Sequence, residues 1–290
     1  MTRPEAPVPA ALPHPVVDNH CHLDIGRGGD PWDAGEAIAA AAAVGVTRIV
    51  QIGCDLRGAR WAVEAAQRHP GLVAGVALHP NEAPRIHAEG GRVALEAAWD
   101  EIEELAGAHD GVRAVGETGL DAFRTGEDGR AIQVESFRRH IDLAKRLDKT
   151  LVIHDRDTHD EVLEVLDAEG APERWVMHCF SGDADFARAC LDRGAHLSFA
   201  GTVTFKNAEP LREALRIAPR DRILVETDAP YLTPHPHRGQ TNASYLVPLT
   251  MRLMAEVRGE DLGELCAAVE GSTFAAFGGV WPAAPTANKS

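Results

Sequence analysis

The stretch that decides the fold lies near the N-terminus. It reads Val16-Val17-Asp18-Asn19-His20-Cys21-His22. A short apolar run of this kind is typical of a buried strand. Because the side chains of a strand alternate between its two faces, His20 and His22 point the same way and could meet one ion. Taken alone, the pair is better explained as a solvated strand end, and it gains weight only from the ligand-type residues that close later apolar runs.

Further short apolar runs follow at regular intervals, and a helical pattern separates each from the next. The expected strands are 16–22, 46–53, 72–79, 112–117, 150–154, 175–179, 195–200 and 222–227. The expected helices are 34–44, 59–68, 93–108, 132–147, 160–168, 184–192, 208–217, 244–257 and 262–277. Near-continuous apolar strands indicate a parallel sheet that is buried on both faces.

This alternation predicts an α/β fold, a (β/α)8 TIM barrel that forms a single domain over residues 16–279. An open doubly wound sheet is the alternative, and the lack of a Gly-x-Gly-x-x-Gly turn after the first strand weakens it. Residues 1–15 are rich in proline and alanine and are expected to be a disordered lead-in. Residues 280–290 are expected to be a flexible tail.

Composition describes an ordinary globular protein. Of the 290 residues, 44% are hydrophobic and 25% are charged. No apolar stretch approaches the roughly 20 residues that span a bilayer, so no membrane association is expected. Five cysteines at irregular spacing form no disulfide framework, which predicts a reducing, cytoplasmic environment. Nothing in the sequence indicates an obligate protein partner.

The net charge is −15, with a pI near 5.3. This charge argues against a broad basic face for nucleic acid. It does not exclude a nuclease, because a site with two divalent cations supplies local positive charge.

Ligand-type residues also close later apolar runs. Together with the first pair, they are His20, His22, Glu117, His154, His178 and Asp228. In a barrel these strand ends meet at one face, where active sites are built. Six donors are too many for one tetrahedral ion but match two divalent ions that share a carboxylate, with Mg, Mn or Zn as candidates. Taken singly, each histidine could instead be buried and hydrogen-bonded, and each carboxylate could cap a turn or helix.

The remaining histidines have weaker claims. His79 closes the third strand, where a substrate-binding or supporting role fits better than metal ligation. His196 begins a strand and is expected to face the inactive end of the barrel. The other histidines lie on helices, loops or termini and are expected to be surface or packing residues.

The chain resembles the TatD-type metal-dependent hydrolases, the deoxyribonuclease branch of the amidohydrolase superfamily, from about residue 16 to about residue 277. The matching stretches are Asp18-Asn19-His20-Cys21-His22-Leu23, Leu78-His79-Pro80, Gly116-Glu117-Thr118-Gly119-Leu120-Asp121, Ile153-His154-Asp155-Arg156, His178-Cys179-Phe180-Ser181-Gly182, Glu226-Thr227-Asp228-Ala229-Pro230-Tyr231-Leu232 and Arg238-Gly239.

The resemblance implies how the six ligands are shared. His20, His22 and Asp228 would hold one ion, His154 and His178 a second, and Glu117 would lie between them. The chain departs from the family pattern at Asn242-Ala243-Ser244, where Asn-x-Pro is usual. It departs again at Ala122-Phe123-Arg124, where a tyrosine is common. Both departures concern substrate preference more than metal binding.

The predicted reaction is hydrolysis of a phosphodiester, in the manner of a 3′–5′ exonuclease on single-stranded DNA. Glu117 and Asp228 are the expected catalytic carboxylates, and Asp228 would take the proton of the attacking water. Arg156 and Arg238 are candidate phosphate clamps, although they could equally be surface charges paired with Asp155 or Asp160.

Two other functions stay open. The first is metal-dependent hydrolysis of a carbon ester or amide, such as a lactone or an aminoacyl ester, which suits the acidic surface. The second is a non-catalytic binding protein on the same barrel. Degraded ligands would indicate that outcome, and none is degraded here.

Overall fold

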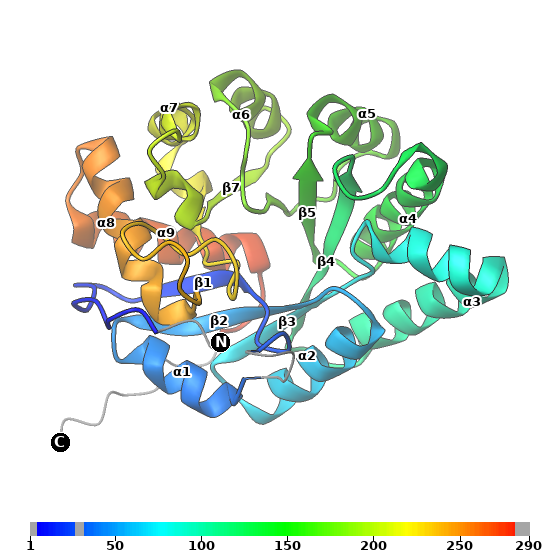
Figure 1. Cartoon of the computed structure of the whole chain (residues 1–290), viewed down its shortest axis with the longest axis horizontal. Coiled ribbons are helices and arrows are strands. Elements are labelled where there is room, and N and C mark those ends of the chain that lie inside the picture. Colours follow the sequence, from blue (N-terminus) through cyan, green and yellow to red (C-terminus); the bar gives the residue numbers. More distant parts are fainter. Residues whose placement is uncertain (1–4, 27–31, 282–290) are drawn as a thin grey trace.

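Eight parallel strands form one sheet whose neighbours follow the order of the chain from β1 to β8 (Figure 1). The structure is a computed structural model that describes residues 5–26 and 32–281. The strands are β1 Val16–Cys21, β2 Val46–Gly53, β3 Leu72–Val76, β4 Val112–Asp121, β5 Thr150–Arg156, β6 Trp175–Met177, β7 His196–Phe199 and β8 Ile223–Val225.

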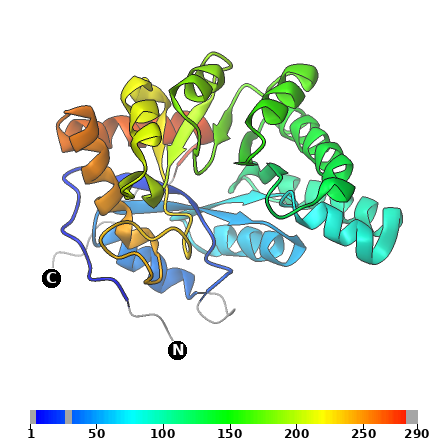
Figure 2. The ribbon, with the colours of Figure 1, turned by 45° about the horizontal axis from the view of Figure 1, so that its top comes forward.

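Helices surround the sheet on its outer side (Figure 2). They are α1 Ala34–Ala42, α2 Leu56–Arg68, α3 Glu82–Gly107, α4 Glu127–Arg146, α5 His159–Glu169, α6 Ala184–Leu191, α7 Glu209–Ile217, α8 Val247–Arg258 and α9 Leu262–Phe277. The described residues also form the short 3-10 turns η2 Gly201–Thr204, η3 Arg220–Arg222 and η4 Ser244–Leu246. No helix of the described chain is long and apolar enough to span a membrane.

The segment after β8 closes the sheet against β1. The Asp228 amide donates to the His20 carbonyl at 2.9 Å, and the His22 amide donates to the Ala229 carbonyl at 2.8 Å. These bonds join the last strand end to the first and place Asp228 beside the two histidines. The predicted (β/α)8 barrel is therefore confirmed.

The barrel interior is filled by small apolar side chains. Val17, Val50, Ile52, Val73, Ala114, Val152, Val176 and Leu224 form one cluster with Ala276 and Phe277 of α9. The Thr150 hydroxyl, at the start of β5, donates to the Ala276 carbonyl at 2.6 Å. The end of α9 thus closes the amino-terminal end of the barrel and leaves the carboxyl ends of the strands for the site.

Aspartate caps fix where several helices begin. Asp33, Asp55, Asp183 and Asp261 each accept a hydrogen bond from an amide in the first turn of α1, α2, α6 and α9. An N-terminal carboxylate satisfies an amide that lacks a helical partner and complements the helix dipole.

Two helices, α3 and α4, begin a full turn or more before the hydrophobic pattern predicts. α3 begins at Glu82 instead of residue 93, and it is interrupted at Gly91, where φ is 73°. α4 begins at Glu127 instead of residue 132. Both added stretches contain few large apolar side chains, so apolar periodicity could not show them.

Residues 5–15 are ordered on the barrel, whereas the sequence analysis expected a disordered lead-in. Ala6 and Leu12 are buried, and the Leu12 amide donates to the Val44 carbonyl at 2.9 Å. The Tyr245 hydroxyl donates to the Ala6 carbonyl at 2.8 Å. Residues 5–15 therefore pack on the barrel, because apolar side chains among them are buried against it. Residues 1–4 and most of the expected C-terminal tail, 282–290, lie outside the described residues.

Candidate active site

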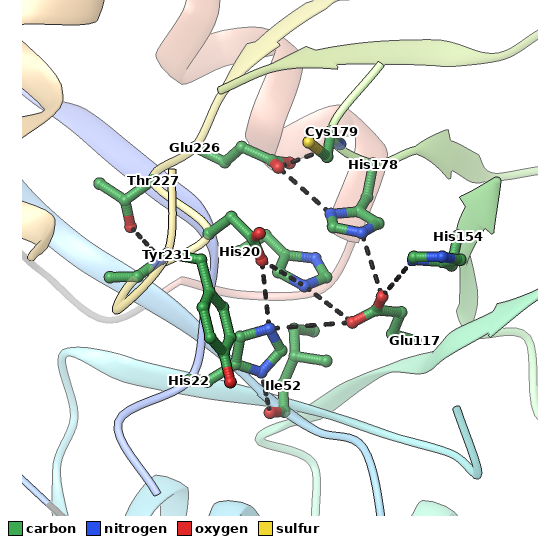
Figure 3. A network of polar contacts seen from close by, with 12 residues as sticks. His20, His22, Ile52, Glu117, His154, His178, Cys179, Glu226, Thr227 and Tyr231 are labelled. Atoms are coloured by element: carbon green, nitrogen blue, oxygen red, sulfur yellow. Dashed lines mark hydrogen bonds and ion pairs between the residues drawn. The ribbon is translucent and has the colours of Figure 1, made fainter. Parts of the chain in front are cut away.

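Glu117 lies at the centre of a cluster of histidines at the carboxyl ends of the strands (Figure 3). Its Oε2 atom is 3.3 Å from His20 Nε2 and 3.8 Å from His22 Nε2. Its Oε1 atom is 2.7 Å from His154 Nδ1 and 3.2 Å from His178 Nε2. Each oxygen of one carboxylate thus faces a different pair of imidazoles.

Asp228 completes the side of the cluster that β1 supplies. Its Oδ1 atom is 3.2 Å from His22 Nε2 and 3.9 Å from His20 Nε2. Its backbone has φ of 55°, in the left-handed region that non-glycine residues rarely adopt. The backbone bond to the His20 carbonyl holds this conformation and aims the carboxylate at the histidines.

Two histidines are oriented through their second ring nitrogen. His22 Nδ1 is 3.0 Å from the Ile52 carbonyl, and His178 Nδ1 is 3.2 Å from Glu226 Oε1. The buried Glu226 also accepts a hydrogen bond from the Cys179 amide at 3.0 Å. Such partners fix the ring and leave Nε2 free for the cluster.

Glu226 was missed by the sequence analysis as a supporting residue. The available signal was its place two positions before Asp228, in the same relation as His20 and His22.

His154 is oriented by a residue that the sequence analysis also missed. Its Nε2 atom is 3.5 Å from Asp121 Oδ2. The Asp121 Oδ1 atom accepts hydrogen bonds from the Phe123 amide at 2.8 Å and the Arg124 amide at 2.9 Å. Asp121 therefore links a histidine of the cluster to the loop that follows β4. Its position in the stretch Gly119-Leu120-Asp121 was the available signal.

His79 lies inside the cluster rather than at its edge. Its Nε2 atom is 3.3 Å from Glu117 Oε1, close to the distance from His178. Its Nδ1 atom accepts a hydrogen bond from the Asn81 amide at 3.1 Å.

Cys54 is a further neighbour, with Sγ 3.4 Å from Glu117 Oε2 and 3.7 Å from His22 Nδ1. Nothing in the residue pattern had marked this cysteine.

The carboxylates of the cluster stay ionised despite burial. Burial raises the pKa of Glu117, but His178, His79 and His154 outweigh it and hold this pKa well below its usual range. Burial likewise raises the pKa of Asp228, and His22 lowers it below the ordinary value.

The histidines respond in opposite directions. Burial and the neighbouring His178 lower the pKa of His20. Burial also lowers the pKa of His22, but Asp228 more than offsets this effect and brings it to about 9.

The cluster fits a divalent metal. His20 is fully buried, and neither of its ring nitrogens has a hydrogen-bond partner among the described residues. An unpaired buried imidazole is unfavourable unless something else satisfies it. Imidazole nitrogens with two ionised carboxylates are a donor set that suits zinc or manganese.

The donors fall into compact groups. The ligand atoms of His20, His22 and Asp228 lie within 4.8 Å of one another, as the resemblance implied for the first ion. On the other side the groups are His20–Glu117–His178 and His79–Asp121–His154, so His154 and His178 do not share one compact group. Glu117 connects the two sides, because Oε1 contacts both histidines.

The two candidate clamps lie on aromatic rings outside the cluster. Arg156 Cζ is 3.8 Å from the centroid of Phe123, and Arg238 Cζ is 4.0 Å from the centroid of Phe205. Neither pairs with an aspartate, as the alternative had suggested. Asp155 instead accepts hydrogen bonds from Thr158 and contacts His159.

A (β/α)8 barrel with this cluster at its carboxyl-terminal face defines a metal-dependent hydrolase, and known proteins of that class resemble the chain. It is 45% identical over 270 residues to a Mycobacterium tuberculosis protein named "Uncharacterized metal-dependent hydrolase TatD", covering 92% of this chain and 99% of that protein. It is 38% identical to the Bacillus subtilis protein "Uncharacterized metal-dependent hydrolase YabD", covering 84% and 91%.

The family is shown by a model described as "TatD related DNase", which matches residues 17–278. The chain belongs to this family and is a metal-dependent hydrolase. Among solved structures, the TatD homologue YJJV of Escherichia coli superposes with a TM-score of 0.80 at 26% identity, covering 90% of this chain and 97% of that one. A TatD family hydrolase of Entamoeba histolytica, at 18% identity and a TM-score of 0.77, shares the fold.

Proposed function

We propose that the protein hydrolyses phosphodiester bonds of single-stranded DNA and removes nucleotides from the 3′ end. The observation that carries the proposal is the placement of Glu117, whose two oxygens face two separate groups of histidines. A bridging carboxylate is what a pair of divalent ions on a phosphate requires.

Six side chains would hold the two ions, which we propose to be magnesium, manganese or zinc. His20, His22 and Asp228 would hold one, His154 and His178 would hold the other, and Glu117 would bridge them. When bound, such ions lower the pKa of a water molecule and neutralise charge on the phosphate oxygens.

Asp228 is the proposed proton acceptor. Its side chain is 14% exposed, whereas that of Glu117 is 5% exposed, so Asp228 is the carboxylate that a water at the mouth reaches more easily. Because its pKa lies below the ordinary value, it is ionised at neutral pH and can accept the proton.

Arg156 and Arg238 are the proposed phosphate contacts. Neither guanidinium makes an ion pair or hydrogen bond within the described chain, so both can meet an anion. His79, with 18% of its side chain exposed beside Glu117, is placed to contact the substrate at the cluster. A site with so few phosphate contacts can bind the end of a single strand more readily than a rigid duplex.

The test is hydrolysis by metal-reconstituted protein of end-labelled single-stranded DNA, a sealed circular duplex, a lactone and an aminoacyl ester. We expect stepwise shortening of the single strand from its 3′ end and an intact duplex. Hydrolysis of the lactone or the aminoacyl ester, with both DNA substrates intact, would instead establish a carbon-ester hydrolase.

A further inference from the structure

Among the residues that the structure describes, five cations around the barrel mouth make no side-chain hydrogen bond or ion pair. They are Arg57, Arg124, Arg156, Lys206 and Arg238, hereafter the rim cations. Every other arginine and lysine of the described chain makes a hydrogen bond or an ion pair.

The rim cations share one end of the barrel. Arg57 begins the helix after β2, Arg124 follows β4, and Arg156 ends β5. Lys206 and Arg238 lie in the segments after β7 and β8. In a chain of net charge −15, the described cations that make no hydrogen bond or ion pair therefore gather where the carboxyl ends of the strands meet.

Two of the rim cations are stacked on aromatic rings. Arg156 lies on Phe123, whose side chain is 64% exposed, and Arg238 lies on the half-buried Phe205. An exposed cation–π pair contributes little to folding stability, so the stability of the loop alone is a weak reason for an exposed phenylalanine. A nucleobase can stack on a planar ring, and its phosphate can contact a guanidinium beside that ring.

The two aromatic pairs lie on different sides of the metal cluster. Phe123 lies in the loop after β4 and Arg156 ends β5. Phe205 and Arg238 lie in the segments after β7 and β8, and His178 follows β6 between the two pairs. The segments after β7 and β8 are joined by a hydrogen bond from the His235 amide to Thr204 Oγ1 at 2.8 Å. They lie beside each other, away from β4 and β5, in both ribbon views (Figures 1 and 2).

Acidic side chains also stand on this rim, among them Asp157, Glu127 and Asp128. They weaken any long-range attraction that the rim cations exert on a polyanion. Stacking, which is insensitive to the net charge, must then supply much of the binding.

We infer that Phe123 and Phe205 are base-stacking platforms, and that a single-stranded oligonucleotide crosses the mouth from one to the other over the metal cluster. The inference rests on the proposed nuclease function and deepens it. It assigns the substrate class as an oligonucleotide several residues long, with the rim cations on its phosphates. Base–aromatic stacking is worth about a factor of 5 to 150 in affinity per base.

The test compares decathymidylate, which reaches both platforms, with dithymidylate, which is too short to do so. We expect F123A and F205A each to lower the ratio of kcat/KM for the long substrate to that for the short one by about 5-fold or more. The loss should be in KM for the long substrate. F123Y, which keeps the ring, should keep the ratio, and V93A removes a comparably exposed apolar side chain from α3 as a control.

A ratio that is unchanged in F123A and F205A would overturn the inference while leaving the nuclease proposal intact. If the wild-type protein hydrolyses neither substrate, the nuclease proposal is refuted. The inference would then be decided by fluorescence anisotropy of labelled decathymidylate in the presence of chelator. Weaker binding by F123A and F205A than by V93A supports the platforms, and equal binding overturns them.

Discussion

Asp228 combines three properties that a general base needs. It is ionised, it is the more exposed of the two central carboxylates, and a backbone hydrogen bond fixes it beside the histidines. It is also one of the six proposed metal ligands, so its substitution must be judged with the metal content measured alongside.

Asp228→Asn keeps the size of the side chain and one oxygen but removes the proton acceptor. We expect kcat on single-stranded DNA to fall by at least about two orders of magnitude, with most of the metal retained. Steady-state kinetics together with elemental analysis measure both quantities. Near-normal turnover by a fully metal-loaded variant would show that another group takes the proton.

Glu226 acts through His178, which it orients by its contact with Nδ1. Glu226→Gln should weaken metal affinity by about 10- to 100-fold, the usual effect of removing a partner of a metal-binding histidine. Excess metal should then restore turnover. Titration with a competing chelator gives the affinity, and Glu264→Gln, at an exposed position on α9, is the matched control. If Glu226→Gln binds metal as tightly as the wild-type protein, the role of this carboxylate is purely structural.

The sequence could predict the residues that close apolar runs, since a barrel brings strand ends together whatever the details of its packing. It could not predict Cys54 or Asp121 as neighbours of the cluster, because those contacts depend on how side chains turn within loops. The alternative considered for Arg156, a pairing with Asp155, is not observed, because that contact too depends on how side chains turn. Asp155 holds the first turn of α5, and the guanidinium lies on Phe123.

Among the elements, strand boundaries follow hydrophobicity only where the strand stays apolar. β2 has the predicted bounds, residues 46–53. β4 and β5 run further than predicted, because their polar ends continue to pair as far as Asp121 with Arg156. That extension places the polar residues of both strands at the mouth, which a search for apolar runs cannot detect.

The amino-terminal end of β7 carries a buried histidine that limits stability in acid. Burial, with Arg222 nearby, lowers the pKa of His196 from 6.5 to about 4. Between these values the unfolded chain binds a proton that the folded chain does not. The free energy of unfolding should therefore fall as the pH is lowered from about 6.5 to about 4, by up to about 1.4 kcal/mol per pH unit.

Urea unfolding of His196→Asn across this pH range measures the effect. The variant should lose stability less steeply than the wild-type protein as the pH falls, whereas the exposed His235→Gln should follow the wild type. If the free energy of unfolding of His196→Asn changes with pH as steeply as that of the wild-type protein, His196 is not the source of the pH dependence.

For the molecule as a whole, the net charge of −15 and the five rim cations predict how salt acts on the substrate. Each phosphate neutralised on a single strand contributes a slope of about −0.7 to log affinity against log salt. Five contacts therefore allow a slope no steeper than about −3.5 for 1/KM. A salt series on end-labelled single-stranded DNA measures it, and a steeper slope would point to a basic surface outside the described mouth.

The central claim is that Glu117 bridges two divalent ions, between the histidines at the end of β1 and the histidines at the ends of β5 and β6. The most direct test is the metal content of each chain, measured by elemental analysis after reconstitution with manganese or zinc and removal of unbound ions. Two equivalents per chain are expected. A ceiling of one equivalent, even with either metal in excess, would contradict the bridged pair.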